Sequence, residues 1–415
     1  MSPKICIFTE TYYPVVGGGE TQARLLAEGL VAEKYKVMVL TRRTNPTQKR
    51  REIIGGVEVY RLSPVGHQHW KKWGLLITGL LALTCYRKKY DLILVSGYRV
   101  IGLAAVLVSL VAGKVCILKA DNNGEMSGSF FTGGLARYGL RKDALIPSLF
   151  LKFRNTVLRR VQAFIAISSD IREELIQFGK IPAHKIHIIP NSVDTTVFHP
   201  VEPTRKNEIR KELGLPDKDL FVIYTGRLVS YKGLFTLIRA WEKIQNEFSN
   251  AGLLLVGAGS LDIFNCEDEL RDYVQQRKLR DSVFFTGEVT NVPTYLQAAD
   301  IFVFPTEQEA FGISLIEAMA CGLPVISTDV GGLKDIIVHQ WNGLIFQPGN
   351  DHELKHAIAA ILDDTSLIHE LGLKALDTIK KSYSIEKVLQ NYIELFQDQS
   401  AFLARKNRRS VVERF

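Results

Sequence analysis

Two carboxylates, Glu309 and Glu317, stand eight residues apart directly after an apolar run at 300–305. The run is typical of a buried strand, and the pattern after it predicts a helix whose first turn lies near Phe311. Glu309 then stands on the loop at the carboxyl end of the strand, and Glu317 lies about 12 Å further on, at about 1.5 Å per residue. This separation suits the two ends of an extended, hydroxyl-rich ligand. The spacing alone also fits two solvated helix glutamates.

The backbone between the two glutamates is suited to an anion. The first N–H groups of a helix have no intrahelical partner, and they carry the positive end of the helix dipole. Such groups receive a phosphate readily. The segment therefore predicts a site for a phosphorylated ligand that also bears hydroxyl groups.

Length and composition predict two ordinary domains. The chain has 415 residues, 46% of them hydrophobic, and its mean hydropathy is near zero, as in soluble proteins.

The five cysteines are scattered, without zinc-ligand spacing, which indicates reduced core thiols. The amino-terminal residues lack the apolar segment and cleavage site of a signal peptide, so we expect a cytoplasmic protein.

Positive charge is concentrated in the first half of the chain. Residues 1–190 contain 28 Lys and Arg against 13 Asp and Glu, a balance of +15; residues 191–415 contain 24 against 31, a balance of −7, and the two give the formal +8. The first half is expected to face an anionic lipid surface or a phosphorylated acceptor, although a solvated basic surface fits as well. Nucleic acid is not expected as a partner, because the sequence has no zinc finger, RNP-type segment or basic heptad region.

Two apolar stretches bear on membrane contact. One, 74–86, is bracketed by Trp70-Lys71-Lys72-Trp73 and Arg87-Lys88-Lys89, and the other spans 100–113. Both are shorter than the about 17 to 25 residues that a spanning helix needs. The second is expected to pack on a sheet, whereas the first fits an interfacial helix on acidic lipid, and cations in the helical pattern 147–161 support this. Peripheral contact with the inner face of a membrane is therefore an open alternative.

The same alternation of strands and helices occurs twice. Each series predicts a parallel sheet covered on both faces, so the fold class is α/β with two doubly wound, Rossmann-like domains. Prolines and turn formers at 191–200 predict a hinge between domains at 1–190 and 201–383. The predicted strands are 5–8, 37–40, 92–95, 115–118 and 164–167 in the first series, and 220–224, 253–256, 283–285, 301–304 and 325–327 in the second.

The loop after the first strand of each domain contains candidate binding residues, because ligands of open α/β sheets bind outside the carboxyl ends of strands. Gly17-Gly18-Gly19 precede a predicted helix from Thr21, and such glycines let backbone amides approach an anion. In the second domain, Arg227 and Lys232 supply the guanidinium and ammonium groups that a diphosphate requires. A tight turn and a solvated pair of cations are the alternatives.

Several classes of enzyme lose support. Gly257-Ala258-Gly259 follows a strand, but Asp262 stands where a dinucleotide fingerprint has its third glycine, and no Walker-type Gly-Lys-Ser/Thr occurs. The sequence also lacks a Gly-x-Ser-x-Gly elbow and a metal-ligand cluster. Hydride transfer, NTP hydrolysis and nucleophile-elbow hydrolase chemistry are therefore not expected.

Taken together, the motifs resemble the retaining GT-B glycosyltransferases of glycosyltransferase family 4, which have a "glycosyltransferase group 1" C-terminal domain. The resemblance covers nearly the whole chain, in the expected order. Its motifs are Gly17-Gly18-Gly19-Glu20, Pro190 to Phe198, Gly226-Arg227 with Lys232-Gly233, Glu309 to Gly312 with Glu317-Ala318, Gly322 to Ile326, and Gly331-Gly332.

The resemblance implies an enzyme that moves a sugar from a nucleotide-sugar donor to a glycan, lipid-linked or small-molecule acceptor with retention, in polysaccharide or glycolipid biosynthesis. It implies two domains that face each other across a cleft, and a C-terminal helix near 384–398, in a segment 384–415, that returns to the first domain. The basic segment 405–409 is itself expected to be a frayed tail. It implies no metal and no cofactor, because cations and a helix amino terminus neutralise the leaving diphosphate.

The resemblance also assigns roles to particular residues. Catalysis would involve Arg227 and Lys232 on the diphosphate and Glu309 on the sugar, and the donor would further contact Gly18, Gly19, Val289, Phe311, Gly312, Ile313 and Glu317.

One departure concerns the acceptor side. Many relatives have a histidine near the end of the fourth or fifth strand, whereas here Leu118 leads into a loop from Lys119 to Glu125. Lys119 or Glu125 is expected to act in its place, with a simple turn-forming loop as the alternative. Two other functions remain open: a sugar-nucleotide epimerase of the same fold, and a non-catalytic sugar-nucleotide binder or membrane scaffold.

Overall fold

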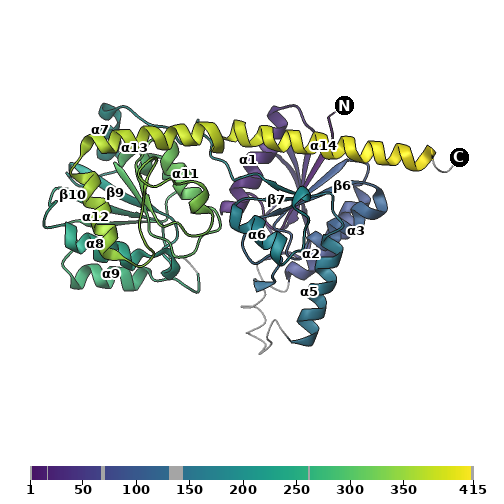
Figure 1. The fold of residues 1–415 in the computed structure, drawn as a ribbon, viewed down its shortest axis with the longest axis horizontal. Helices are drawn as coiled ribbons and strands as arrows, with labels where there is room; N and C mark the ends of the chain where they lie inside the picture. The colour runs from purple at the N-terminus through teal and green to yellow at the C-terminus, as the bar shows by residue number, and fades with distance from the viewer. Residues whose placement is uncertain (1, 16, 67–70, 130–143, 260–261, 413–415) are drawn as a thin grey trace. The chain divides into compact units, whose positions relative to one another are not determined.

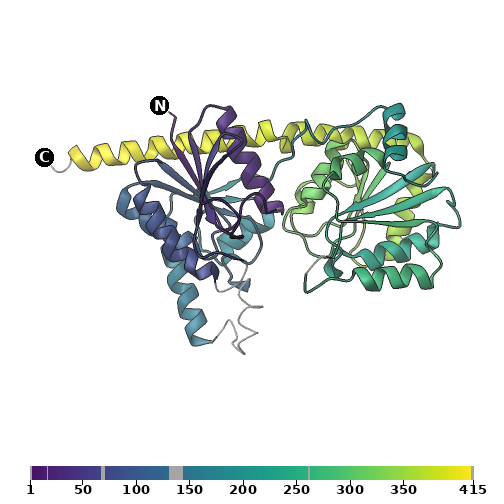
Figure 2. The same cartoon turned by 180° about the vertical axis from the view of Figure 1, so that it is seen from behind.

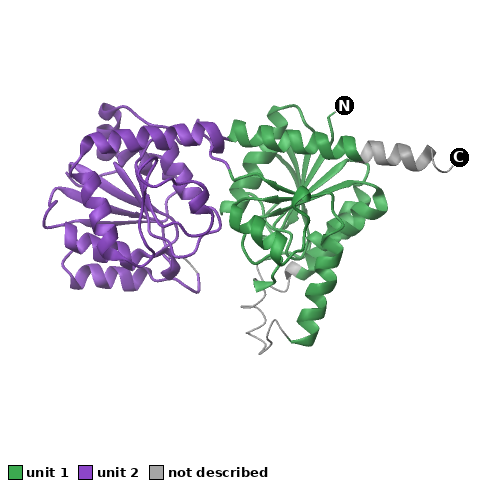
Figure 3. Ribbon diagram, in the orientation of Figure 1, with its two compact units in different colours: residues 1–191, 385–415 green, residues 192–384 purple. Residues whose placement is uncertain are grey.

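The computed structural model describes residues 2–15, 17–66, 71–129, 144–259 and 262–412. The chain divides into two compact units, shown in Figure 3. Unit 1 consists of residues 1–191 and 385–415, and unit 2 consists of residues 192–384. The hinge expected at 191–200 stays a prediction.

Unit 1 is built on a sheet of eight strands in its described part. Neighbouring strands are parallel, except that β3 runs antiparallel to β4. Most of these strands are runs of aliphatic residues buried on both faces, as expected where helices cover both sides of a parallel sheet. In spatial order the strands are β3 (Arg51–Ile54), β4 (Val57–Leu62), β2 (Val37–Arg42), β1 (Ile5–Thr9), β5 (Leu92–Ser96), β6 (Val115–Ala120), β7 (Ala163–Ala166) and β8 (Ile186–Ile188).

Two groups of helices cover the faces of this sheet (Figure 1 and Figure 2). Successive strand residues point to opposite faces, and Ile5 and Ile7 belong to a core that includes Leu389 and Phe396 of the last helix. On the other face a Cβ at Gly79 would lie 2.4 Å from the Phe8 ring, so α2 packs closely there. The first face carries α1 (Gly18–Ala32) and α14 (Ile385–Val412), and the second carries α2 (Lys71–Cys85), α3 (Gly102–Ala112) and α5 (Leu145–Leu158). Unit 1 also contains α6 (Ser169–Gln177).

Unit 2 repeats the architecture with a sheet of six strands, all parallel, in its described part. In spatial order they are β11 (Val283–Gly287), β10 (Ala251–Val256), β9 (Leu220–Thr225), β12 (Ile301–Phe304), β13 (Val325–Ser327) and β14 (Leu344–Ile345). The helices are α7 (Pro203–Glu212), α8 (Leu234–Ile244), α9 (Glu267–Gln276), α10 (Val292–Ala298), α11 (Ile313–Ala320), α12 (Asp351–Leu362) and α13 (Thr365–Thr378).

The sequence pattern missed four strands. β3 and β4 form a hairpin around Gly55 and Gly56, which both have positive φ, and β3 lies at an edge with alternate residues exposed. β8 and β14 have only three and two residues. Short edge strands bury few side chains, so the hydrophobic signal of β3, β8 and β14 is weak. β4 has six residues, and Glu58 and Arg61 interrupt its apolar pattern.

Three further expectations were wrong in detail. The last helix continues to Val412, so the basic segment 405–409 is helical rather than a frayed tail. Cys85 is exposed, whereas the other four cysteines are buried as expected of core thiols. Helix α11 begins at Ile313, two residues after Phe311, so helical rise does not set the whole separation of Glu309 from Glu317.

Candidate active site

A buried ion pair lies at the carboxyl edge of the sheet in unit 2. Lys232 Nζ lies 2.6 Å from Glu309 Oε2, and the two side chains are only 12% and 17% exposed. Lys232 ends the short helix η3 (Ser230–Lys232) after β9, and Glu309 follows β12, the neighbouring strand. Parallel strands therefore bring together two residues that are 77 positions apart. Glu309 is not a solvated helix glutamate.

Two glycines allow the backbone segments around this pair to approach one another closely. Gly233 has a φ of +66°, and a Cβ there would lie 1.9 Å from the carbonyl oxygen of Pro305. Gly331 has a φ of +58°, and a Cβ there would lie 1.7 Å from the carbonyl oxygen of Glu309. A side chain at either position would force the backbone apart, so the sequence must have glycine where these loops meet.

Arg227 stands on the same edge but is more open to solvent. Its side chain is 57% exposed, pairs with Asp262, and donates a 2.7 Å hydrogen bond to the Tyr231 hydroxyl. The edge thus presents one sheltered ammonium and one accessible guanidinium. Each already has a carboxylate partner, so an anionic ligand must compete with Asp262 and Glu309.

The start of α11 lies beside the ion pair. Glu309 Oε1 accepts a 3.0 Å hydrogen bond from the backbone N–H of Ala310, which fixes the carboxylate against its own loop. Gly312 precedes the helix with a φ of +105°, and Ile313 is its first residue. Phe311 is buried against Tyr383, with ring centroids 6.0 Å apart. The packed ring anchors the loop that carries Glu309.

Glu317 lies one turn into α11 and is half-buried. Burial raises the pKa of its carboxyl group to about 8. No described residue donates a hydrogen bond to this carboxyl group. A carboxylate without a donor in a desolvated position is poorly stabilised, and hydroxyl groups of a ligand would supply the missing hydrogen bonds.

Three glycines lie at the carboxyl edge of the sheet, next to Arg227. Gly226, Gly257 and Gly287 follow or end the adjacent strands β9, β10 and β11, and Gly257 donates a 3.0 Å hydrogen bond to the carbonyl of Gly287. Val289 follows two residues later, so it stands at the same edge of the sheet. All the candidate residues of unit 2 therefore belong to one edge.

In unit 1, Gly18 and Gly19 are the first two residues of α1, at the carboxyl end of β1. A Cβ at Gly19 would meet no atom within 4 Å, so its backbone is open to a ligand. The carboxylate of Glu20 accepts a hydrogen bond from the Thr11 hydroxyl, which ties the loop to the helix start. The expected helix began at Thr21, and the glycines are instead part of its first turn.

Lys119 and Glu125 also follow a strand end in unit 1, but both are buried. Lys119 pairs with Asp121 and donates a 3.1 Å hydrogen bond to the Asn191 side chain. Ser96, at the end of the neighbouring strand β5, donates a 2.5 Å hydrogen bond to Asp121. This polar network holds the loop after β6 to the end of β5.

Glu125 is the least satisfied carboxyl group of that loop. Burial raises its pKa to about 7, and the opposing effect of Arg99, 3.7 Å away, is smaller. Its Oε2 and the hydroxyl of Tyr98 are both buried without a hydrogen-bond partner among the described residues. Buried Arg154 holds the segment by donating to the backbone carbonyls of Glu125 and Arg99. The loop is thus an organised structure rather than a simple turn.

Two acidic partners of the candidate residues were not predicted from the sequence. Asp262 served only to exclude a dinucleotide fingerprint, yet it pairs with Arg227. Asp121 was part of the loop after β6 but was not singled out, yet it pairs with Lys119. Unpaired cations at a strand end could have prompted a search for acids at neighbouring strand ends.

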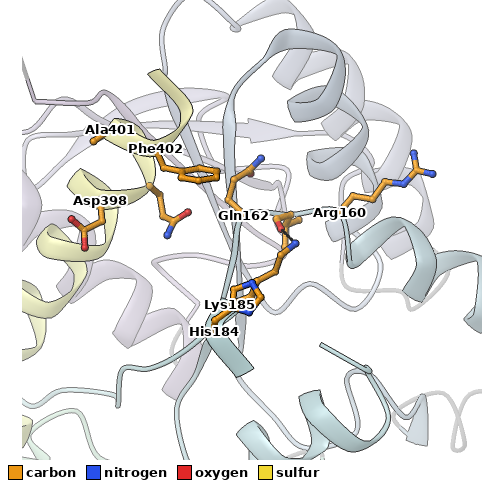
Figure 4. A pocket seen from close by; sticks show the side chains of 9 residues that line it. Arg160, Gln162, His184, Lys185, Asp398, Ala401 and Phe402 are labelled. Carbon is orange, nitrogen blue, oxygen red and sulfur yellow. Dashed lines mark hydrogen bonds between the residues drawn. The ribbon is translucent and has the colours of Figure 1, made fainter. Parts of the chain in front are cut away.

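The cavity shown in Figure 4 does not lie at the carboxyl edge of the sheet of unit 1. The cavity in Figure 4 has a volume of about 610 Å³, and its lining includes Gln162, Lys185, Asp398 and Phe402. Gln162 and Lys185 directly precede β7 and β8, so this cavity lies at the amino edge of the sheet, opposite Gly18 and Lys119.

In the part of the chain described, no group of three or more His, Cys, Asp and Glu side chains could hold a metal ion. No described helix has the length and apolar character needed to cross a membrane.

Two family models match the chain. Glycosyl transferases group 1 matches residues 205–377, and Glycosyltransferase Family 4 matches residues 16–197. A lipopolysaccharide core biosynthesis mannosyltransferase of Rhizobium meliloti is 30% identical over 283 residues, which are 66% of this chain and 77% of that protein. An uncharacterized glycosyltransferase of Methanocaldococcus jannaschii is 28% identical and covers 95% of this chain and 98% of its own.

Solved structures share the fold. Sucrose-phosphate synthase from Thermosynechococcus elongatus has a TM-score of 0.78 at 24% identity, covering 96% of this chain and 99% of that one. The Anabaena protein HepE, in complex with UDP and glucose, has a TM-score of 0.74 at 20% identity, and the match covers 95% of this chain and 99% of that one. At this identity the likeness establishes the GT-B fold.

The fold and the matched families define the class of protein: it is a glycosyltransferase with two Rossmann-like domains. The chain belongs to the group 1 and family 4 glycosyltransferases. These matches do not favour an epimerase or a non-catalytic scaffold.

Proposed function

We propose that the protein transfers a sugar from a nucleotide-sugar donor to a hydroxyl group of a glycan, lipid-linked or small-molecule acceptor, with retention and without a metal ion. The observation that carries the proposal is the sheltered Lys232–Glu309 pair, 2.6 Å apart at the carboxyl edge of unit 2. The ammonium group of Lys232 suits a phosphate, and the carboxylate of Glu309 suits hydroxyl groups. A sugar diphosphate presents both groups within a few bonds.

Charge development gives each residue its role in bond breaking. Cleavage of the anomeric C–O bond leaves positive character on the sugar and negative charge on the diphosphate. Arg227, Lys232 and the first amides of α11 stabilise that negative charge more in the transition state than in the ground state. The leaving phosphate then takes the proton of the acceptor hydroxyl on the same face of the sugar. These cations do the work for which other transferases use a divalent ion.

The remaining contacts orient the donor. Glu309 and the backbone of Phe311, Gly312 and Ile313 hold the sugar hydroxyls, and Glu317 accepts hydrogen bonds from the ribose. The backbone at Val289 contacts the base. For Glu317, this role is supported by its lack of a donor within the described structure and by its raised pKa.

Unit 1 contributes to both substrates in this proposal. Gly18, the first residue of α1, and the open backbone at Gly19 offer N–H groups to a phosphate of the donor. Lys119 and Glu125 serve the acceptor side, and burial raises the pKa of the Glu125 carboxyl group to about 7. Relatives whose names refer to lipopolysaccharide core synthesis favour an acceptor from polysaccharide or glycolipid biosynthesis, used by a cytoplasmic protein at an anionic membrane surface.

Donor binding tests the proposal first. We expect one of the UDP-, GDP- or ADP-sugars, or its free nucleotide, to raise the melting temperature of the purified protein in EDTA. Glu317→Ala should reduce that shift, whereas Glu353→Ala, at an exposed position on α12, should leave it unchanged. Absence of a shift with any nucleotide at millimolar concentration would contradict the proposal, and a shift that requires a divalent ion would overturn its metal-free part.

A further inference from the structure

Two helices of unit 1 expose large apolar side chains. On α2, Ile77 and Leu81 are 65% and 57% exposed; on α5, Ile146 and Phe153 are 80% and 61% exposed. Leu145 and Leu149 of α5 are exposed as well. We call these six residues the α2–α5 face. Single exposed apolar residues are ordinary, but six of them on two helices that touch one another mark an interaction surface.

The two helices both pack against α3 and touch one another through an aromatic contact. The rings of Trp73 on α2 and Phe150 on α5 meet edge to face, with centroids 5.6 Å apart. Ile77 stands one turn after Trp73, and Ile146 and Phe153 stand one turn before and after Phe150, so each continues the side on which the helices touch. The aromatic contact therefore joins the apolar rows of α2 and α5.

The segments that carry this face are strongly basic. Residues 71–90 contain five Lys and Arg, and residues 144–169 contain four; neither segment contains an Asp or Glu. Lys152 is exposed beside Phe153, and Arg160 is exposed just beyond the end of α5. At the end of α2, Arg87 and Lys88 are exposed. Arg154 is buried and structural, so the exposed cations of these segments are the ones available to an anionic partner.

We propose that the α2–α5 face inserts into the headgroup region of an anionic lipid bilayer. Apolar side chains on helices that lie in the interface bury among the acyl chains, while flanking Lys and Arg contact lipid phosphates. Charge complementarity selects this occupant over a second copy of the chain, because two copies would bring the same basic surfaces together. The inference deepens the proposed function by placing the enzyme where a lipid-linked acceptor would lie, but binding itself requires no sugar transfer.

Vesicle flotation tests the inference directly. The full-length protein should float with vesicles of phosphatidylcholine containing about one third phosphatidylglycerol at low ionic strength. The bound fraction should fall in about 0.5 M salt, because screening removes the electrostatic attraction. The double variant Ile146→Asp/Phe153→Asp should weaken partitioning by about tenfold or more, because it places carboxylates on the inserted surface.

Matched variants separate this surface from general effects. Leu373→Asp changes an exposed leucine on α13 of unit 2 and should bind vesicles as the wild type does. Lys152→Glu/Arg160→Glu should weaken capture by anionic vesicles, whereas Lys211→Glu on α7, in unit 2, should have much less effect. Circular dichroism melting and the nucleotide-induced thermal shift, measured on the same preparations, show whether each variant is folded and still binds donor.

Several outcomes would overturn the inference. They are no capture of the wild type at low salt, equal capture by pure phosphatidylcholine vesicles, and equal capture of the Ile146→Asp/Phe153→Asp variant. A wild-type dimer that becomes monomeric in this variant would assign the face to a second copy instead. If flotation succeeds but no nucleotide shifts the melting temperature, the surface stands and the proposed donor chemistry fails.

Discussion

Lys232 Nζ lies 2.6 Å from Glu309 Oε2, and the backbone of each residue is held by a neighbouring glycine that admits no side chain. In the absence of a donor the two charges neutralise one another in a sheltered position. A bound sugar diphosphate would give the ammonium a phosphate and the carboxylate a set of hydroxyls. The pair therefore sets the main expectation for catalysis.

Loss of either member should abolish most transfer. Lys232→Ala and Glu309→Gln are each expected to lower the rate by about 10²- to 10³-fold, because each removes a preorganised contact to the charge or the sugar in the transition state. Initial rates with saturating donor measure this. Lys243→Ala removes a solvent-exposed ammonium that lies 3.1 Å from Asp351 and should leave the rate unchanged. Wild-type rates for the Lys232 variant would remove the pair from the mechanism.

Gly331→Ala should destabilise unit 2 and displace Glu309. Its positive φ disfavours any side chain, and its Cβ would also lie 1.7 Å from the Glu309 carbonyl oxygen. Gly214→Ala is the matched control, since Gly214 has a φ of +62° but no atom within 4 Å of its Cβ. We expect about 1 kcal/mol of destabilisation for Gly214→Ala and at least about 2 kcal/mol more for Gly331→Ala. Equal losses in urea unfolding would show that backbone strain, not the close approach, requires glycine.

Glu317 should make the stability fall as pH rises. Its pKa is raised from 4.5 in the unfolded chain to about 8 in the folded protein, so the folded state binds the extra proton between these values. Across this window the carboxyl group lowers the free energy of unfolding by at most about 1.4 kcal/mol per pH unit. Glu317→Gln should therefore have a flatter pH profile and exceed the wild type in stability at pH 8. Parallel profiles in urea unfolding at pH 5.5 and pH 8 would contradict the assignment.

Arg227 and Asp262 should have opposite effects on donor binding. Arg227→Ala removes a guanidinium from the diphosphate and should weaken binding. Asp262→Asn removes the competing carboxylate while keeping the shape of the side chain, so affinity for the free nucleoside diphosphate should be retained or rise by a factor of a few at low salt. Isothermal titration calorimetry measures both. If Asp262→Asn loses binding as Arg227→Ala does, Asp262 is needed to position the arginine.

Glu125→Gln should separate the acceptor step from donor binding. The Glu125 carboxyl group has a pKa of about 7, and its Oε2 has no hydrogen-bond partner in the described structure. The variant should keep the nucleotide-induced thermal shift but transfer more slowly, and it should lose an inflection near pH 7 in the rate profile. Glu173→Gln, at an exposed position on α6, serves as the control. An unchanged rate and pH profile would leave Glu125 with a structural role only.

The sequence by itself determined the two doubly wound domains and the kinds of residue at the site. Strands such as β1 and β12 are continuous apolar runs, and a buried parallel strand needs that pattern along its own length. Arg227, Lys232 and Glu309 lie in the loops that follow such runs, so local sequence places them near strand ends. These are local properties, and a local pattern is enough to predict them.

Only the tertiary structure decided which of these residues meet. The order of strands puts β9 beside β12, which pairs Lys232 with Glu309, and it puts Asp262 beside Arg227. It also buries Glu125 and removes solvent from Glu317, which raises both pKa values. Contacts and desolvation depend on residues far away in the chain, so they are set by strand order and close packing, which the spacing of residues along the sequence does not contain.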